Sequence, residues 1–166
     1  MEMKNNMIYL DYAATTPLFP EVLETVNLVS RDVFANPSSV HSLGLKAENC
    51  LARSRQTISE ILEILPSMVY FTSGATESNN WAFETAWDYG QKRGNEMLYC
   101  ASDHASVRGK ARAMKARGAV PLEVRVTKEG LWDLDHLETL LNPRVIFASV
   151  LWGNNDFMCI YPYGGN

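Results

Sequence analysis

The chain has 166 residues, of which 46% are hydrophobic and 20% charged, a composition typical of a folded globular domain and unlike that of disordered, collagen-like or coiled-coil chains. With 19 acidic and 15 basic residues the net charge is −4, so no basic field favours a nucleic-acid partner. No apolar run reaches the roughly 20 residues of a membrane-spanning helix, so no membrane partner is expected. The first residues resemble neither a signal nor a transit peptide, which predicts a cytoplasmic protein.

The N-terminal part of the sequence predicts a short strand, a loop and two helices. Residues 8–10 are apolar and form a candidate strand, and the run 11–17 is rich in turn residues. A helix is predicted over 20–33, because a proline suits the first helical position and apolar residues recur at helical spacing. Residues 36–39 end this helix, and a longer amphipathic helix follows over 42–65.

After Pro66 the pattern changes to strands that alternate with helices. The predicted order is strand 68–71, a glycine-containing turn and a helix to 91, strand 97–101, helix 105–117, strand 120–126, helix 134–141 and strand 144–151. This alternation predicts an α/β fold with a mostly parallel sheet and additional N-terminal helices. In such sheets ligands bind beyond the carboxyl ends of the strands, so the loops that follow the strands are the candidate sites.

The loop after strand 68–71 contains Ser73, Gly74, Ala75 and Thr76 at the predicted start of a helix. Unpaired backbone N–H groups, a glycine that permits close approach and a hydroxyl together favour a phosphate site. The alternative is a purely structural role, in which Ser73 caps the helix and Glu77 interacts with its dipole. The loop matches neither of the common nucleotide-binding glycine motifs.

The loops after two further strands add polar candidates at the same edge. His104 follows strand 97–101, where an imidazole could stack on a planar ligand or transfer a proton. The alternative is that Asp103 caps the next helix and His104 is a surface residue. Residues 153–156 offer amide donors after strand 144–151, although alone they indicate only a turn.

Neither the other histidines nor the cysteines suggest a metal site. His41 and His136 have no second ligand at a suitable spacing, so no metal is expected. The three cysteines are widely spaced, which does not indicate a disulfide framework or a metal-binding pair. Cys50 and Cys100 are interpreted as small buried hydrophobic residues.

Several of these segments, taken together and in this order, resemble the cysteine desulfurases, which are pyridoxal-phosphate enzymes of the class V aminotransferase family. The segments that carry the resemblance are YLDYAATTP (9–17), NPSSVH (36–41), FTSGATESN (71–79), DH (103–104) and NN (154–155). The resemblance implies an incomplete three-layer α/β sandwich of the pyridoxal-phosphate-dependent transferase fold. It also implies an N-terminal arm at the active-site mouth over 1–19, the N-terminal part of the large domain over 20–156 and a divergent tail over 157–166.

The resemblance also assigns roles to individual residues. Ala75 and Thr76 would bind the cofactor phosphate, and His104 would lie over the pyridine ring and assist proton transfer as the catalytic residue. Asn155 would contact the ring oxygen of the cofactor, and Asn36 would line the substrate mouth.

The activity that the resemblance implies is the removal of sulfur from L-cysteine, which leaves alanine and an enzyme persulfide for iron–sulfur cluster assembly or thiolation. A homodimer and a sulfur-acceptor scaffold protein are the implied partners. None of the six lysines lies in the family's Ser-x-His-Lys context, and no cysteine lies at the nucleophile's position. The chain is therefore expected to be inactive alone and to bind pyridoxal 5'-phosphate non-covalently at best.

Two alternatives to independent activity remain open. In one, the chain is a non-catalytic truncated module that pairs with a full-length desulfurase; in the other, a separate polypeptide supplies the lysine and the cysteine. The family topology separates strand 68–71 from the next strands by strands that this sequence lacks. The resemblance therefore predicts exposed strand edges and apolar surface, and a chain that is marginally stable, prone to aggregation or dependent on a partner.

Overall fold

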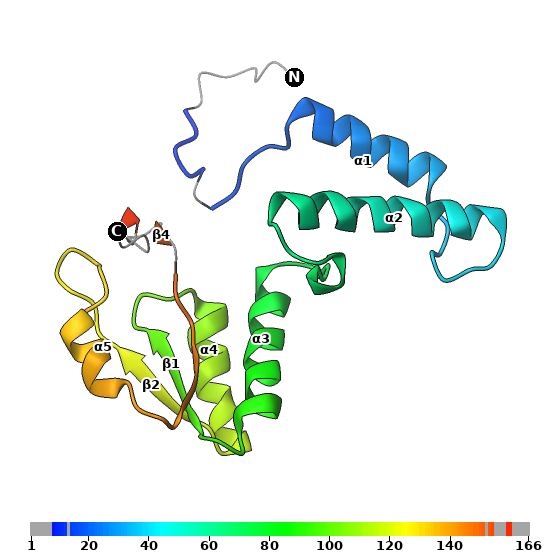
Figure 1. Ribbon diagram of the computed structural model, residues 1–166. Helices are drawn as coiled ribbons and strands as arrows, with labels where there is room; N and C mark the ends of the chain where they lie inside the picture. The colour runs from blue at the N-terminus through cyan, green and yellow to red at the C-terminus, as the bar shows by residue number, and fades with distance from the viewer. Residues whose placement is uncertain (1–7, 13, 152, 155–158, 161–166) are drawn as a thin grey trace. The chain divides into compact units, whose positions relative to one another are not determined.

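The computed structural model describes residues 8–12, 14–151, 153–154 and 159–160 (Figure 1). The chain divides into two compact units, Met1–Phe71 and Thr72–Asn166. No helix in these described ranges is both long and apolar enough to cross a membrane.

The first unit contains two helices and a short 3₁₀ turn. Helix α1 (Pro20–Asp32) begins at its proline, and the His41 ring accepts a hydrogen bond from the Gly44 N–H (3.3 Å) at the start of α2 (Ser42–Ile61). Both predicted helices are confirmed. Helix α2 ends before the predicted residue 65, because Glu63 adopts a left-handed backbone conformation with φ of 54° that a helix cannot accommodate.

The two shortest predicted strands, 8–10 and 68–71, are wrong. Residues 8–10 have no regular structure, and Pro66–Met68 forms the 3₁₀ turn η1. The carbonyl of Val69, which is buried, accepts a hydrogen bond from the Arg55 side chain (3.2 Å) in place of a strand neighbour. A strand requires a second strand to pair with, and the described residues offer none to this segment.

The second unit is an α/β arrangement around a three-stranded parallel sheet with the strand order β2-β1-β3 (Figure 1). Its elements are α3 (Ala75–Gly90), β1 (Glu96–Cys100), α4 (Ala105–Ala113), η2 (Met114–Arg117), β2 (Val120–Val124), α5 (Leu134–Leu140), β3 (Val145–Ala148), and the short antiparallel pair β4 (Gly153–Asn154) and β5 (Cys159–Ile160). From α3 onward the predicted alternation of strands and helices is therefore confirmed, with most element ends shifted by only a few residues; the first predicted strand, 68–71, is missing from it.

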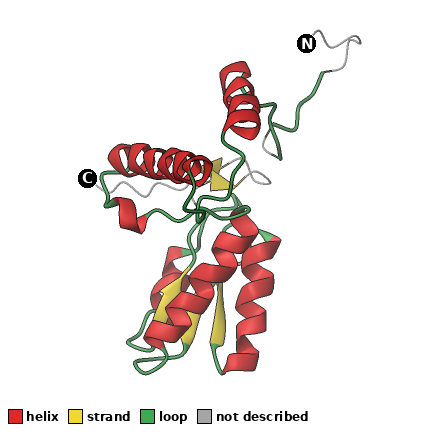
Figure 2. Cartoon of the chain, turned by 90° about the vertical axis from the view of Figure 1, so that its right-hand side faces the viewer, coloured by secondary structure: helices red, strands yellow, loops and turns green. Residues whose placement is uncertain are grey.

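Side chains of β1 alternate between two hydrophobic layers. Met97 and Tyr99 pack with residues of α3 and α4, and these helices lie in front of the strands in Figure 2. Leu98 and Cys100 point to the opposite face, where they pack with β2 and α5. A strand buried on both faces between helical layers is the arrangement expected of a three-layer sandwich.

The carboxyl ends of β1 and β3 are joined by Asp103, whose side chain is only 3% exposed. Its carboxylate accepts a hydrogen bond from the Cys100 N–H (2.8 Å) and one from the Ser149 side chain. Burial raises the pKa of Asp103, and these two hydrogen bonds and the charge of Arg108 oppose that rise. This buried carboxylate fixes the turn that leads from the sheet into α4.

We predict that Gly94→Ala destabilises the protein by about 1–3 kcal/mol. A Cβ at Gly94 would lie 2.1 Å from the carbonyl oxygen of Arg144, so the backbone would have to move. The matched control is Gly109→Ala within α4, where a Cβ meets nothing within 4 Å. This control should gain up to about 1 kcal/mol from helix propensity. Thermal unfolding of both variants checks the prediction, and equal stabilities would contradict it.

We predict that Asp103→Ala costs about 1–3 kcal/mol, because the buried Cys100 N–H loses its acceptor. Asp103→Asn keeps an acceptor oxygen and should cost less. Since the pKa of Asp103 is raised in the folded state, its carboxyl group stabilises the fold most at low pH, and this contribution is lost as the pH rises. Urea unfolding from neutral into acidic pH should therefore show wild type gaining stability relative to Asp103→Asn; a constant difference would contradict the assignment.

Candidate functional site

The first turn of α3 presents free backbone donors. Gly74 is the N-cap residue, with φ of 156° and ψ of 178°, and the N–H groups of Ala75 and Thr76 belong to the turn in which helices lack internal acceptors. Both residues are exposed, and no atom lies within 4 Å of where a Gly74 Cβ would be. The helix that follows has 16 residues, so its dipole also favours an anion here.

Ser73 does not cap α3 through its side chain, which corrects the structural alternative for this loop. Instead, one carboxylate oxygen of Glu77 accepts hydrogen bonds from both the N–H (2.6 Å) and the hydroxyl (2.7 Å) of Ser73. These bonds lower the pKa of Glu77, the backbone N–H having the largest effect. The donors of Ser73 are thus occupied, and the donors left for a ligand are the N–H groups that follow and the Thr76 hydroxyl.

His104 begins α4 and is exposed. Its Nδ1 accepts a hydrogen bond from the Ser106 N–H (3.1 Å) and lies 2.9 Å from the Ser106 hydroxyl oxygen. The helix cap therefore comes from His104 and not from Asp103, whose carboxylate is directed back to the sheet. The imidazole is held at one nitrogen, while Nε2 has no hydrogen-bond partner among the described residues.

Two residues that the sequence analysis missed connect His104 with α3. The side-chain amide of Asn79 donates to the Ser106 hydroxyl (2.9 Å), and the same hydroxyl contacts the His104 ring. Asn79 lies one turn after Ala75, so these contacts join the open N-terminus of α3 to the imidazole. The sequence points to them only by position: Asn79 lies one helical turn after Ala75, and Ser106 lies two residues after His104.

An ion pair farther along α3 holds the same two helices together. Glu84 of α3 pairs with Lys110 of α4 and with Arg117, and Arg117 also pairs with Asp88 (2.8 Å). Lys110 is the main cause of the lowered pKa of Glu84. The N-terminus of α3 and His104 are therefore held at one edge of the second unit.

The other predicted residues belong to other parts of the chain. Asn36 belongs to the first unit, is exposed and accepts a hydrogen bond from the Ser38 N–H (2.9 Å). Asn155 lies outside the described residues. His41 and His136 each accept a backbone N–H at Nδ1, and no group of three metal-ligating side chains occurs in the described part of the chain.

The Cys100 thiol is buried at the end of β1, 3.2 Å from the Ser102 hydroxyl. Burial is the main cause of its raised pKa, so the thiol stays protonated and is a poor nucleophile. The sequence-based interpretation of Cys100 as a buried small residue is confirmed, whereas Cys50 is only half-buried.

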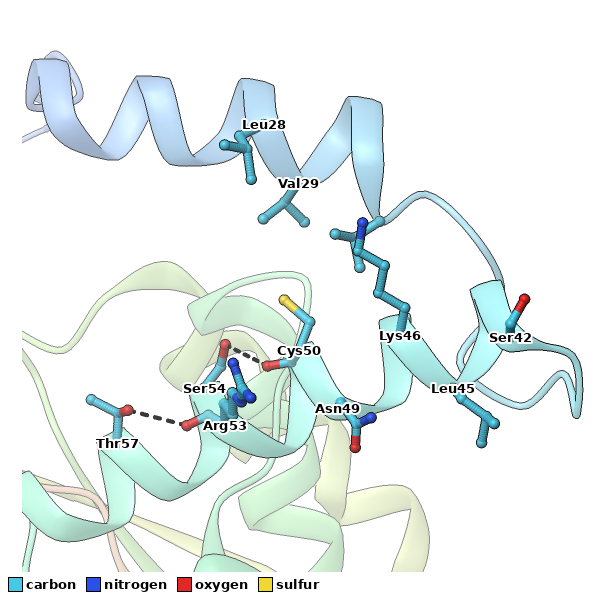
Figure 3. A pocket seen from close by; sticks show the side chains of 11 residues that line it. Leu28, Val29, Ser42, Leu45, Lys46, Asn49, Cys50, Arg53, Ser54 and Thr57 are labelled. Atoms are coloured by element: carbon cyan, nitrogen blue, oxygen red, sulfur yellow. Dashed lines mark hydrogen bonds between the residues drawn. The ribbon is translucent and has the colours of Figure 1, made fainter.

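The first unit has a separate cavity of about 680 Å³ between α1 and α2 (Figure 3). Leu28 and Val29 of α1 face Lys46, Cys50 and Arg53 of α2 across it. None of the predicted site residues lines this cavity.

Comparisons with known proteins agree with the fold. The family model described as aminotransferase class-V matches residues 8–160. The chain is 33% identical over 150 residues to a cysteine desulfurase IscS of Neisseria meningitidis, which covers 90% of this chain and 37% of the relative. It is also 33% identical over 156 residues to the mitochondrial cysteine desulfurase of Eremothecium gossypii, covering 93% of this chain and 32% of the relative.

Solved structures give the same result. The structure described as a NifS-like protein superimposes with a TM-score of 0.84 at 30% identity, over 90% of this chain and 41% of that one. The structure described as SspA in complex with cysteine gives a TM-score of 0.83 at 30% identity, over 93% and 44%. The chain thus spans less than half the length of the relatives it matches. With the family model matching most of its residues, the chain belongs to the aminotransferase class-V family.

Proposed function

We propose that this chain carries the part of a cysteine desulfurase site that holds the phosphate and the ring of pyridoxal 5'-phosphate. The observation that carries the proposal is the hydrogen-bonded link from the open α3 N-terminus through Asn79 and Ser106 to His104. It brings together a phosphate-binding element and an aromatic ring, which are the two contacts that a phosphorylated pyridine needs.

The residues present fit such a group. The N–H groups of Gly74, Ala75 and Thr76, together with the Thr76 hydroxyl, can surround a phosphate, and the space in front of Gly74 is open. Glu77 stays ionised, and its carboxylate is held by the two donors of Ser73, which are therefore not available to a phosphate. His104 offers an exposed ring for stacking and a free Nε2 for holding a proton.

When bound, the cofactor would act as an electron sink for the reaction of L-cysteine. The residues of this chain would bind the phosphate, orient the ring and hold a proton at Nε2 of His104. A substrate amino acid is supported by the relative whose structure is described as a complex with cysteine. Asn36 and Asn155 remain proposed contacts to the substrate and to the ring oxygen.

The covalent steps of the reaction require residues that this sequence does not provide. None of its six lysines stands in the family's Ser-x-His-Lys context, and Cys100 is buried and protonated. We therefore propose that these 166 residues do not complete the covalent steps by themselves, and that the lysine and the cysteine come from outside them, for example from a full-length desulfurase or from a chain that carries both.

The surface of α1 supports pairing with another chain. This helix has no buried residue, and its exposed apolar side chains are Val22, Leu23, Val26 and Leu28, which are 43–52% exposed. An amphipathic helix with no fully buried residue and several exposed apolar side chains is typical of an interface. We propose that α1 contacts a second subunit, either in a desulfurase homodimer or in a mixed dimer with a full-length enzyme. A sulfur-acceptor protein would bind to that dimer.

We predict that the chain binds pyridoxal 5'-phosphate at least tenfold more tightly than pyridoxal, which has no phosphate. The expected factor follows from hydrogen bonds to a charged group, each contributing about 1.5–3 kcal/mol. Thr76→Val removes one donor and should reduce this preference. Thr85→Val, at an exposed position of the same helix, is the matched control and should not. Equilibrium dialysis with both ligands checks the prediction, and equal affinities would exclude the phosphate site.

We predict that the chain alone releases no alanine from L-cysteine and associates with a full-length desulfurase through α1. Leu23→Glu should weaken the association at least tenfold, because it places a charge in an apolar contact. Asn27→Glu adds the same charge at an exposed polar position of α1 and should have little effect. Light scattering and alanine assays on separate and mixed proteins check this. Activity of the chain alone, or equal effects of the two variants, would overturn the pairing proposal.

A further inference from the structure

We propose that Asn79 and Ser106 are positioning residues that hold the His104 ring in the neutral tautomer with its proton on Nε2. The assignment of this tautomer rests on hydrogen bonds in the structure. Its consequence for a bound cofactor rests on the proposed function.

The backbone decides the state of Nδ1. A backbone N–H can only donate, and the Ser106 N–H points to Nδ1 of His104 at 3.1 Å. Nδ1 must therefore offer a lone pair and cannot carry a proton. In a neutral imidazole the proton is then on Nε2.

The Ser106 side chain reinforces this state. Its hydroxyl oxygen accepts the Asn79 amide at 2.9 Å, so the hydroxyl proton is free to point to Nδ1, also at 2.9 Å. Two donors thus converge on one ring nitrogen, and Asn79 of α3 orients the second of them. His41 and His136 each accept a single backbone N–H at Nδ1, with distances of 3.3 and 3.1 Å.

The two hydrogen bonds at Nδ1 determine which ring nitrogen of His104 carries the proton. Moving the proton to Nδ1 would break the hydrogen bond from the Ser106 N–H and force the Ser106 hydroxyl to accept instead of donate. Nε2, which has no partner among the described residues, is left as the donor. His104 would therefore present an N–H hydrogen-bond donor at a fixed position.

The test is long-range ¹H–¹⁵N NMR on the 166-residue chain labelled at histidine, in mildly alkaline solution without cofactor. Expected for His104 are an unprotonated Nδ1 and a protonated Nε2. In Ser106→Ala the population of the Nδ1-protonated tautomer should rise about fivefold, the factor expected of one hydrogen bond. Ser106→Thr, which keeps the hydroxyl, should restore the wild-type signal.

Two asparagine variants distinguish loss of the Asn79–Ser106 hydrogen bond from a general effect of removing an asparagine from α3. Asn79→Ala should shift the His104 signals in the same direction as Ser106→Ala, but less. Asn80→Ala is the matched control, since Asn80 bonds the Thr76 carbonyl and not Ser106 (2.7 Å). Unchanged His41 and His136 signals establish that each variant is folded.

Averaged His104 shifts in the wild type, or a Ser106→Ala variant identical to it, would overturn the inference. The measurement needs no cofactor, so its failure is distinct from that of the proposed function. If the tautomer is fixed but pyridoxal and its phosphate bind equally well, this inference is supported and the proposed cofactor site is wrong.

Discussion

Strand β1 is the element on which the second unit depends. It pairs with β2 on one side and β3 on the other, and its successive side chains enter two different hydrophobic layers. Both layers of helices therefore pack on side chains of this one strand, Glu96–Cys100. The turn after this strand is fixed by the buried Asp103. His104 directly follows that turn, so the position of its ring depends on the same strand.

The sequence predicted those elements whose signal is local. The long amphipathic pattern of α2 and the apolar run of β1 are recognisable without knowledge of their neighbours, because periodicity and burial coincide. Residues 68–71 show why short apolar runs mislead. Val69 is buried as a strand residue would be, but its carbonyl accepts a hydrogen bond from Arg55. Only the three-dimensional structure shows that none of the described strands pairs with this segment.

In the candidate site, too, features with a local sequence signal could be predicted and long-range contacts could not. The positions of Ala75 and Thr76 at a helix start could be predicted from the glycine turn before them, although the strand expected before that turn does not form. The position of His104 could be predicted because a helix start after a strand is recognisable from local sequence. The partners of His104 could not, because Asn79 and Ser106 are 27 residues apart and meet only through the packing of α3 against α4. The role of Asp103 was misassigned for a related reason: an aspartate before a helix predicts a cap, but burial directed its carboxylate to the strand it follows.

The state of Cys100 has a consequence for the sulfur chemistry that the family carries out. A persulfide is an electrophilic species that exchanges with any accessible thiolate. Cys100 lies only a few residues from His104, yet it is covered by Val124 and Trp132 in the core and kept protonated by burial. If the proposed desulfurase site forms a persulfide, Cys100 would therefore not compete for its sulfur, because the thiol is both buried and protonated.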